Sequence, residues 1–231
     1  MAHEDHSSEL AGLAAELTTP RDEVVTTEVI LKRALEVVDD ADHVSLTIRS
    51  GKRFRTLASS SEQAEGYDRL QYELGEGPCI DSATQGEWFR SGDLAADPRW
   101  PRWGPIAARR GAGSLLSIRL LSERRPFGAL NLYSDDQGDF ADPEQVEVAL
   151  LFTVHATSAL VAVRLVSGLE TALSSRHEIG VAQGILMARY DLSVDQSFAT
   201  LRRVSSHTNT KLRDVAAHVI RTRQLPEAEP R

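Results

Sequence analysis

The chain is poor in cysteine, and its histidines form no metal-ligand pattern. Among its 231 residues only Cys79 is a cysteine, so an intramolecular disulfide and a thiolate-rich metal site are both excluded. The seven histidines lack the paired spacing that a metal site needs. We therefore expect a protein of a reducing compartment that binds no metal.

Export signals and membrane-length apolar runs are also missing. The first ten residues, MAHEDHSSEL, are acidic and polar, whereas a secretory signal is basic and then apolar. The longest apolar stretch, 149–163, is interrupted by hydroxyl residues and a histidine, and it is shorter than the roughly 20 residues of a membrane span. We expect a soluble, cytoplasmic protein with no membrane partner.

Catalytic motifs are missing as well. The sequence contains no nucleophile elbow, no glycine- and lysine-containing phosphate loop and no dinucleotide fingerprint. Asp135 and Asp136 follow a predicted strand, as in a phosphoacceptor site, but the alternating strands and helices of a receiver domain are absent. We predict a protein that is not an enzyme.

Charge is distributed unevenly along the chain. The formal net charge is -8, yet residues 174–224 hold eight basic and four acidic residues, a net charge of +4. Such asymmetry indicates two parts with different partners. A chain of 231 residues is long enough for two domains.

The acidic part has the pattern of a mixed α and β domain. Alternating apolar residues predict strands over 43–49 and 54–58, and a hairpin of two further strands over 114–121 and 128–133. The intervening region, 59–113, is rich in glycine and proline and predicts a long loop region of the kind that often carries function.

Two helices flank these strands. Thr19 and Pro20 predict a helix start, with Thr19 as the capping hydroxyl and Asp22 in the first turn. A second helix opens at Asp142-Pro143 and can continue to about Leu173, on the order of 45 Å. Its apolar residues surround much of the cylinder, so it needs two burial partners. We predict that one face covers the sheet and another joins a second subunit, giving a homodimer with a coiled coil.

The basic part predicts a small helical bundle. It divides into three helix-like stretches separated by turns at 190–192 and 207–209, and Ser193 to Gln196 fits a capping box. An apolar stripe marks the last helix, and a facing stripe of Phe198, Leu201 and Val204 marks the helix before it. A core of about 50 residues is marginal alone, so we expect dimerisation to support it.

Residues 169–220 resemble the ANTAR family of antitermination regulators. The matching features occur in register along this segment: Arg176, Ile179, Ala182, Gly184, Met187, Phe198, Leu201, Leu212, Val215 and Ala216. The resemblance implies that this part binds paired RNA hairpins with short loops near a terminator and prevents the terminator from forming. One departure is Gln183, where many members of the family have a lysine.

Residues from about 20 to 165 resemble a GAF sensor domain. The resemblance rests on LGEGPC (74–79), DPRWPRW (97–103) and GALNLYS (128–134). It implies a central antiparallel sheet with packed helices and a pocket for an unidentified small molecule; no other cofactor is expected. The predicted fold class is thus α+β: a GAF-like antiparallel sheet with packed helices, a long connecting helix and a C-terminal three-helix ANTAR bundle.

These assignments divide the chain into four segments. They are a flexible N-terminus (1–19), a GAF-like sensor domain (20–165), an ANTAR RNA-binding domain (166–225) and a tail (226–231).

RNA recognition requires cations for phosphates and polar side chains for unpaired bases. The candidate RNA contacts are Arg176, Gln183, Gly184, Arg202, Arg203, His207 and Lys211. From charge alone, the favoured interpretation is that these residues are the solvated faces of small helices, whereas the ANTAR resemblance favours RNA contacts. Gly180 and Gly184 each cost about 1 kcal/mol relative to alanine within a helix, so either a nucleotide or a neighbouring helix should approach them closely.

The candidate ligand-binding residues of the GAF-like part are Cys79, Trp88, Trp100 and Trp103. Cys79 follows Gly77-Pro78 at a predicted helix start, a position that can lower a thiol's pKa and favour redox sensing; we favour the alternative of a small buried residue. The tryptophans could line a pocket, but we favour the interpretation that they anchor the loops over the core.

The resulting hypothesis is a signal-responsive transcription antitermination regulator. The alternative is a ligand- or redox-sensing protein-interaction module without RNA binding. DNA binding through a helix-turn-helix is a weaker third interpretation, because no basic recognition helix stands out.

Overall fold

The chain forms two compact units. The computed structural model describes residues 22–123 and 125–226. The chain divides into a first unit, Met1–Arg164, and a second unit, Leu165–Arg231; we call them the sheet unit and the helical unit. The expected flexible segment 1–19, the helix start at Thr19-Pro20 and most of the expected tail lie outside the described residues.

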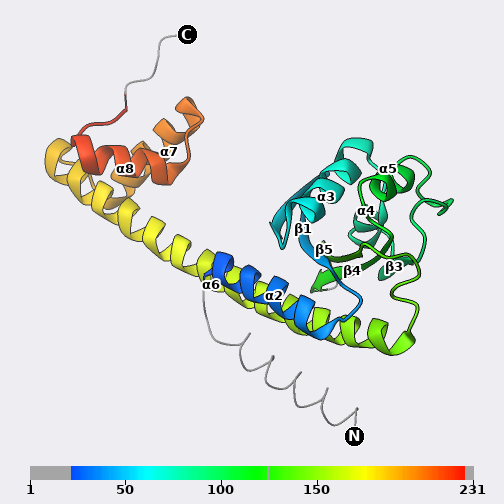
Figure 1. Cartoon of the computed structure of the whole chain (residues 1–231). Coiled ribbons are helices and arrows are strands. Elements are labelled where there is room, and N and C mark those ends of the chain that lie inside the picture. The colour runs from blue at the N-terminus through cyan, green and yellow to red at the C-terminus, as the bar shows by residue number, and fades with distance from the viewer. Residues whose placement is uncertain (1–21, 124, 227–231) are drawn as a thin grey trace, which may run out of the picture. The chain divides into compact units, whose positions relative to one another are not determined.

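The sheet unit is built on five antiparallel strands in the order β2-β1-β5-β4-β3 (Figure 1). The strands are β1 (His43–Ser50), β2 (Arg53–Ser59), β3 (Trp88–Ser91), β4 (Ser114–Ser122) and β5 (Arg125–Ser134). The predicted hairpin is β4–β5. The predicted α+β class with an antiparallel sheet is confirmed, and β2 and β3 are its edge strands.

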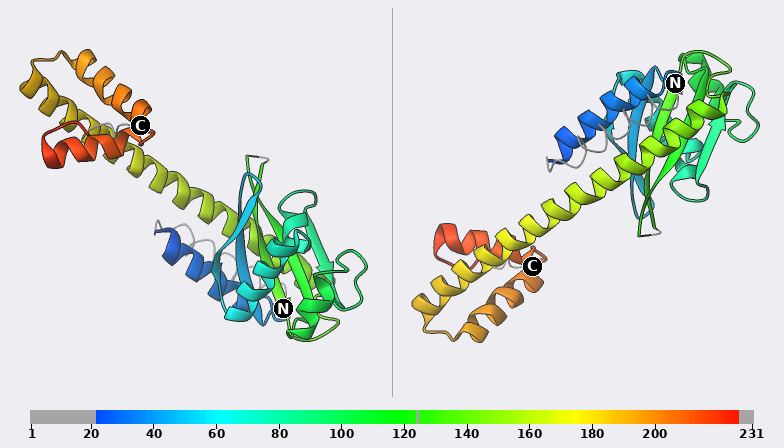
Figure 2. Two further views of the ribbon diagram at one scale, coloured as in Figure 1. Left: turned by 90° about the horizontal axis from the view of Figure 1, so that it is seen from above. Right: turned by 90° about the horizontal axis from the view of Figure 1, so that it is seen from below.

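Helices α2 (Glu23–Val37) and α6 (Pro143–Tyr190) cover one face of the sheet, as Figures 1 and 2 show. Their apolar sides join the strands in one core that includes Ile30, Leu46, Leu130, Leu132, Phe152 and Leu160. Helix α2 is capped by Asp22, whose carboxylate accepts a hydrogen bond from the Val25 N–H at 2.9 Å. The placement of Asp22 in the first turn was therefore wrong.

The opposite face carries α3 (Glu62–Leu74), α4 (Pro78–Ser82) and α5 (Gly104–Arg109) over a second core. The prediction of a long loop region over 59–113 was wrong, because these helices and β3 lie within it. Helix α3 is capped by Ser61, which accepts from the Ala64 N–H, and ends at Gly75, which has a left-handed φ of 65°. Its buried side includes Asp68 and Gln71, so the apolar stripe that would reveal a helix is broken.

Helix α6 continues to Tyr190, well past the predicted end near Leu173, and it contributes to the cores of both units. By length and composition α6 passes the criterion for a membrane span, but 56% of its most apolar window is buried inside the protein. A helix whose apolar side covers a sheet meets the same criterion.

The helical unit packs the last turns of α6 against α7 (Val194–Thr208) and α8 (Leu212–Thr222). Its core is small: Ala182, Leu186, Leu201, Val215, Ala216 and Val219. The predicted capping box at the start of α7 is confirmed, with Ser193 and Gln196 hydrogen-bonded reciprocally. The expectation that Phe198 belongs to the core was wrong, because its side chain is 38% exposed.

Candidate functional site

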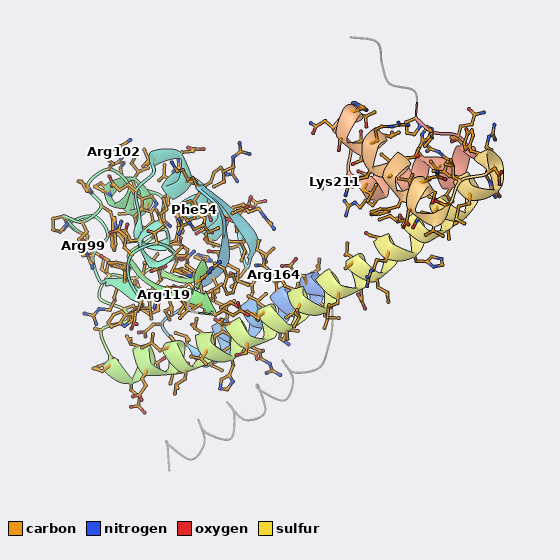
Figure 3. All side chains as sticks on the ribbon, turned by 180° about the vertical axis from the view of Figure 1, so that it is seen from behind. Phe54, Arg99, Arg102, Arg119, Arg164 and Lys211 are labelled. Atoms are coloured by element: carbon orange, nitrogen blue, oxygen red, sulfur yellow. The ribbon has the colours of Figure 1, made fainter. Side chains whose placement is uncertain are left out.

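Four of the candidate RNA contacts are cations with no internal partner. Arg176, Arg202, Arg203 and Lys211 are exposed, and none of them forms an ion pair within the described ranges (Figure 3 labels Lys211). The ion pair found among the described residues of the helical unit joins Arg213 to Asp214 at 3.4 Å. A guanidinium without a carboxylate partner keeps its donors for an external anion.

Helix α6 presents a set of these candidates on one side. Arg176, Gly180, Gln183 and Gly184 follow a spacing of four, seven and eight residues, which places them on the same helix face. A Cβ added to either glycine would have no heavy atom within 4 Å. The interpretation that a neighbouring helix packs on Gly180 or Gly184 is therefore wrong for the described chain, and the space beside them is open.

Helix α7 continues this surface. Val194, Phe198 and Arg202 are spaced four residues apart and share one face of α7. Gln183 of α6 donates a hydrogen bond from Nε2 to the Val194 carbonyl at 3.2 Å. This contact brings the two helix faces together, and we call the combined surface, Arg176, Gly180, Gln183, Gly184, Val194, Phe198 and Arg202, the α6–α7 face.

Phe198 is the residue of this face that the sequence reasoning missed. The actual buried side of α7 runs through Ser197 and Leu201, each with no exposed surface, and Ser197 is the direct neighbour of Phe198. Burial of a serine in preference to a phenylalanine is not visible in a hydrophobicity pattern. Arg203 and His207, four residues apart, share an adjoining face of α7, and Lys211 occupies the position just before α8.

The structure separates the four candidates of the sheet unit. Cys79, Trp100 and Trp103 are buried on the side of the sheet that α3 to α5 cover. Trp88 is 43% exposed and pairs with Ile118 of β4. Because Ile118 belongs to the core beneath α6, Trp88 lies on the opposite side of the sheet. Trp88 therefore lies apart from the other three candidates, and the ligand-binding role of the four residues stays a prediction.

The two buried tryptophans anchor loops, as we favoured. Trp100 donates from Nε1 to Asp81 at 2.8 Å, and Trp103 donates from Nε1 to the Tyr67 carbonyl at 3.1 Å. Trp88 instead lines a groove of about 430 Å³ together with Leu121, Leu150 and Val154. In the described part of the chain, no group of three or more His, Cys, Asp or Glu side chains is placed to hold a metal ion.

Cys79 is the small buried residue that we favoured. It has no exposed surface, and burial raises the pKa of the Cys79 thiol well above its usual range. The expectation that its position at a helix start lowers this pKa was wrong. Because the thiolate is the reactive form, burial and the raised pKa both disfavour reaction of Cys79 in the folded conformation.

A buried polar network surrounds Asp68 beneath α3 and α4. The Asp68 carboxylate accepts hydrogen bonds from Tyr133 at 2.7 Å, Thr56 at 2.9 Å and Asn131 at 3.2 Å. Gln71 extends the network, since its amide donates to the Tyr133 hydroxyl and its carbonyl accepts from the Cys79 N–H. The network joins the sheet to α3 and α4 on the side where the GAF resemblance implies a pocket.

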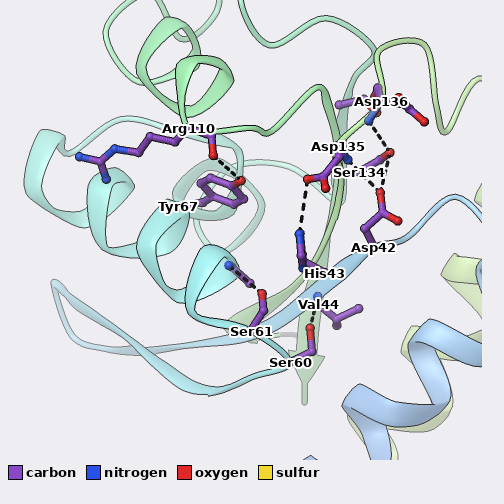
Figure 4. Close-up of polar contacts among 12 residues, drawn as sticks. Asp42, His43, Val44, Ser60, Ser61, Tyr67, Arg110, Ser134, Asp135 and Asp136 are labelled. Atoms are coloured by element: carbon purple, nitrogen blue, oxygen red, sulfur yellow. Dashed lines mark hydrogen bonds and ion pairs between the residues drawn. The ribbon is translucent and has the colours of Figure 1, made fainter.

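A second set of polar contacts fastens the end of the sheet where β1 begins and β5 ends (Figure 4). His43 lies 3.4 Å from Asp135, and the Asp135 N–H donates to Asp42 at 2.9 Å. Tyr67 donates to the Arg110 carbonyl at 3.1 Å and holds the end of α5. These contacts hold the loops around the buried network in place.

Asp68 makes the stability of the sheet unit depend on pH. Burial raises the pKa of Asp68 to about 6, against about 3.9 in an unfolded chain. Between roughly pH 4 and 6 the folded state therefore binds more protons than the unfolded state, so stability falls as the pH rises through this window. We expect the raised pKa of Asp68 to increase the free energy of unfolding at pH 4 by up to about 3 kcal/mol relative to pH 7, where this stabilisation is lost. Urea denaturation at several pH values gives the free energy of unfolding, which should vary less with pH in Asp68→Asn than in the unmodified protein. The same pH dependence in both proteins would contradict the assignment.

The chain thus joins an α+β sheet unit to a helical unit with an exposed basic face. The GAF domain model matches residues 20–161, and the ANTAR domain model matches residues 167–220. The chain belongs to the GAF domain family and has the GAF-ANTAR architecture. GAF domains are sensor modules, and ANTAR domains are associated with RNA-binding antitermination regulation.

Solved structures share the fold of the sheet unit. The GAF domain of a phosphoenolpyruvate-protein phosphotransferase from Acinetobacter is 12% identical, with a TM-score of 0.56, over 71% of this chain and 97% of that one. The corresponding domain from Coxiella burnetii is 16% identical, with a TM-score of 0.56, over 71% and 96%. At these identities the likeness shows the fold alone. None of the curated proteins compared with the chain matches it.

Proposed function

We propose that the chain is a cytoplasmic, non-enzymatic transcription antitermination regulator whose helical unit binds hairpins in nascent RNA in response to a signal. The observation that carries this proposal is the α6–α7 face, where unpaired cations, an exposed aromatic ring and open glycines lie together. Bound to hairpins near a terminator, the protein would prevent the terminator from forming.

The α6–α7 face and the adjoining residues Arg203, His207 and Lys211 each have a role in this proposal. Arg176, Arg202, Arg203 and Lys211 neutralise phosphates, and Gly180 and Gly184 let the RNA backbone approach α6 closely. The Phe198 ring stacks on an unpaired loop base. Gln183 donates one N–H of its side-chain amide to the Val194 carbonyl, so the second N–H and the amide oxygen are available for a base edge. His207, exposed beside Arg203, adds a polar contact.

The functional unit is a homodimer formed through α6. Large apolar side chains on α6 are exposed by 43% to 72%: Leu151, Val154, Leu165, Val166, Leu169 and Leu173. Exposed leucines recurring along one long helix favour a coiled coil with a second copy, which removes them from water. Two copies related by symmetry also suit a target made of two hairpins.

The signal acts on the sheet unit, where an unidentified small molecule is the proposed ligand. Because α6 is continuous and supplies core residues to both units, a ligand that favours one arrangement of α6 changes the population of the RNA-binding state. Mass spectrometry of small molecules that co-purify with the full chain should identify the ligand.

The proposal is tested by measuring affinity for a leader RNA with two hairpins and for an unrelated RNA of equal length. We expect tighter binding to the hairpin RNA and a linear fall of log affinity with log salt concentration. Equal, weak binding to both RNAs would contradict specific recognition and would favour the protein-interaction module.

A further inference from the structure

The sheet unit carries a basic patch in an otherwise acidic part of the chain. The β1–β2 hairpin, RSGKRFR (49–55), contains four cations, and no acidic residue occurs between His43 and Ser61. Outside residues 174–224 the chain has a net charge of -12, made up of eighteen basic and thirty acidic residues. The β1–β2 hairpin is therefore positively charged although the sequence outside residues 174–224 is acidic.

The three outermost cations of the hairpin have no internal partner. Lys52, Arg53 and Arg55 are exposed, and none of them forms an ion pair or a side-chain hydrogen bond in the described part of the protein. Many other cations of the sheet unit are paired: Lys32 with Glu36, Arg69 with Glu65, Arg99 with Asp97 and Arg119 with Glu87. Arg49 has a structural task, because it donates to the Gly51 and Ala83 carbonyls.

The strand register places Arg53 and Arg55 side by side. They are two residues apart on the edge strand β2, opposite Ser50 and Ile48, so both project from the face that α2 and α6 cover. Phe54, between them, points to the other face and stacks on Tyr72 with ring centroids 6.2 Å apart. This stacking fixes the strand against α3, so Arg53 and Arg55 leave the same face of β2.

Other cations adjoin the same end of the sheet. The β4–β5 turn adds exposed Arg125, and Arg164 of α6 lies over the Phe127 ring, next to Gly128 in the ladder (Figure 3 labels Arg164). Among the described acids at this end, Glu23 is paired with Arg164 at 2.6 Å, and Asp22, the cap of α2, and Glu123 are exposed. We call Lys52, Arg53, Arg55 and Arg125 the basic end.

We propose that the basic end is a second RNA-binding surface, which contacts the phosphates of RNA held by the helical unit. This inference rests on the proposed RNA binding of the α6–α7 face. Because α6 links the units covalently, an RNA whose flanking segments are long enough to reach both units would contact the second unit intramolecularly. Guanidinium groups match phosphate geometry, and phosphate contacts add affinity without sequence information. An anionic membrane suits the hairpin less well, since its one large apolar side chain, Phe54, is occupied by Tyr72.

The test compares full-length variants on a two-hairpin RNA with long flanking segments. The triple variant K52A/R53A/R55A keeps Arg49, and its matched control, K32A/R69A/R109A, removes the same charge elsewhere in the sheet unit. We expect K52A/R53A/R55A to bind the RNA roughly tenfold more weakly than the unmodified protein at about 0.15 M salt. The slope of log affinity against log salt concentration should be shallower by about 0.7–0.9 for each phosphate that the variant no longer neutralises. The control should bind like the unmodified protein, and scrambling the flanks should change nothing.

The outcomes separate this inference from the proposed function. If both triple variants bind like the unmodified protein while R202E/R203E does not bind, the basic end is not an RNA surface and the proposed function stands. If the unmodified protein binds no hairpin RNA, the proposed function fails as well. If K52A/R53A/R55A loses binding only to phosphatidylserine vesicles, the partner is a lipid and the inference is overturned. Ultraviolet cross-linking of RNA to the peptide 49–55 of the unmodified protein supplies a measurement that does not depend on a variant's folding; absence of that cross-link contradicts the proposal.

Discussion

Reversing the charges of Arg202 and Arg203 to glutamate is expected to lower the affinity of the full chain for the two-hairpin RNA by roughly 10²–10⁴. A hydrogen bond to a charged group contributes about 1.5–3 kcal/mol, and every 1.4 kcal/mol is a factor of ten in affinity. Both side chains are exposed and unpaired, so the substitutions should leave the fold intact. The measurement is a binding isotherm at fixed salt, repeated over a salt series.

The matched control is K32E/R69E, which makes the same change in net charge within the sheet unit and should bind normally. A second variant, Phe198→Ala, separates stacking from charge. Stacking on an aromatic ring is worth about 1–3 kcal/mol per base. We therefore expect Phe198→Ala to weaken binding to hairpins with unpaired loops and to spare a blunt duplex. Unchanged binding by R202E/R203E would place the RNA surface elsewhere or remove it altogether.

Replacing Leu169 and Leu173 with glutamate is expected to convert the dimer to a monomer at micromolar concentration. These side chains are 62% and 72% exposed in the single chain. Burying a leucine is worth roughly 1.5–3 kcal/mol, and symmetry removes each contact twice. The dimer dissociation constant should therefore rise by at least about 10³. Gel filtration with light scattering gives the mass directly.

The control for this prediction is T171E/S174E, which adds the same charge to polar, exposed positions of the same helix and should remain dimeric. Loss of the dimer should also weaken binding to the two-hairpin RNA, because the second hairpin then no longer binds intramolecularly to the second subunit. Affinity for a single isolated hairpin should change little. One chain per particle for the unmodified protein would overturn the dimer proposal.

Several parts of the fold could be predicted from local pattern. The β4–β5 hairpin follows from alternating apolar residues on both sides of a polar turn, and the start of α7 follows from the Ser193–Gln196 capping box. The end of α6 was harder to place. Sequence reasoning divided it near Leu173, although no proline or cap interrupts the helix before Asp191, which has a left-handed φ of 52°.

The candidate site was only partly predictable. Charge located Arg202, Arg203 and Lys211, because exposed cations in an acidic chain stand out in the sequence. Phe198 was missed because its burial depends on how α7 rotates against α6 and α8, and that rotation is set by the buried pair Ser197 and Leu201. Asp68 was missed because a carboxylate in a core is identified only by donors such as Tyr133 and Asn131, which are more than 60 residues away.

The sequence by itself determined the two-part organisation, the antiparallel sheet and the position of positive charge, since periodicity, caps and composition are local properties. Tertiary structure decided which side chains meet. It separated Trp88 from Cys79, Trp100 and Trp103, buried the thiol, left Gly180 and Gly184 open, and joined Gln183 to the face of Phe198 and Arg202. Whether a side chain is exposed and whether it has an intramolecular partner both depend on the packing of distant segments. These two properties distinguish a binding surface from a solvated helix.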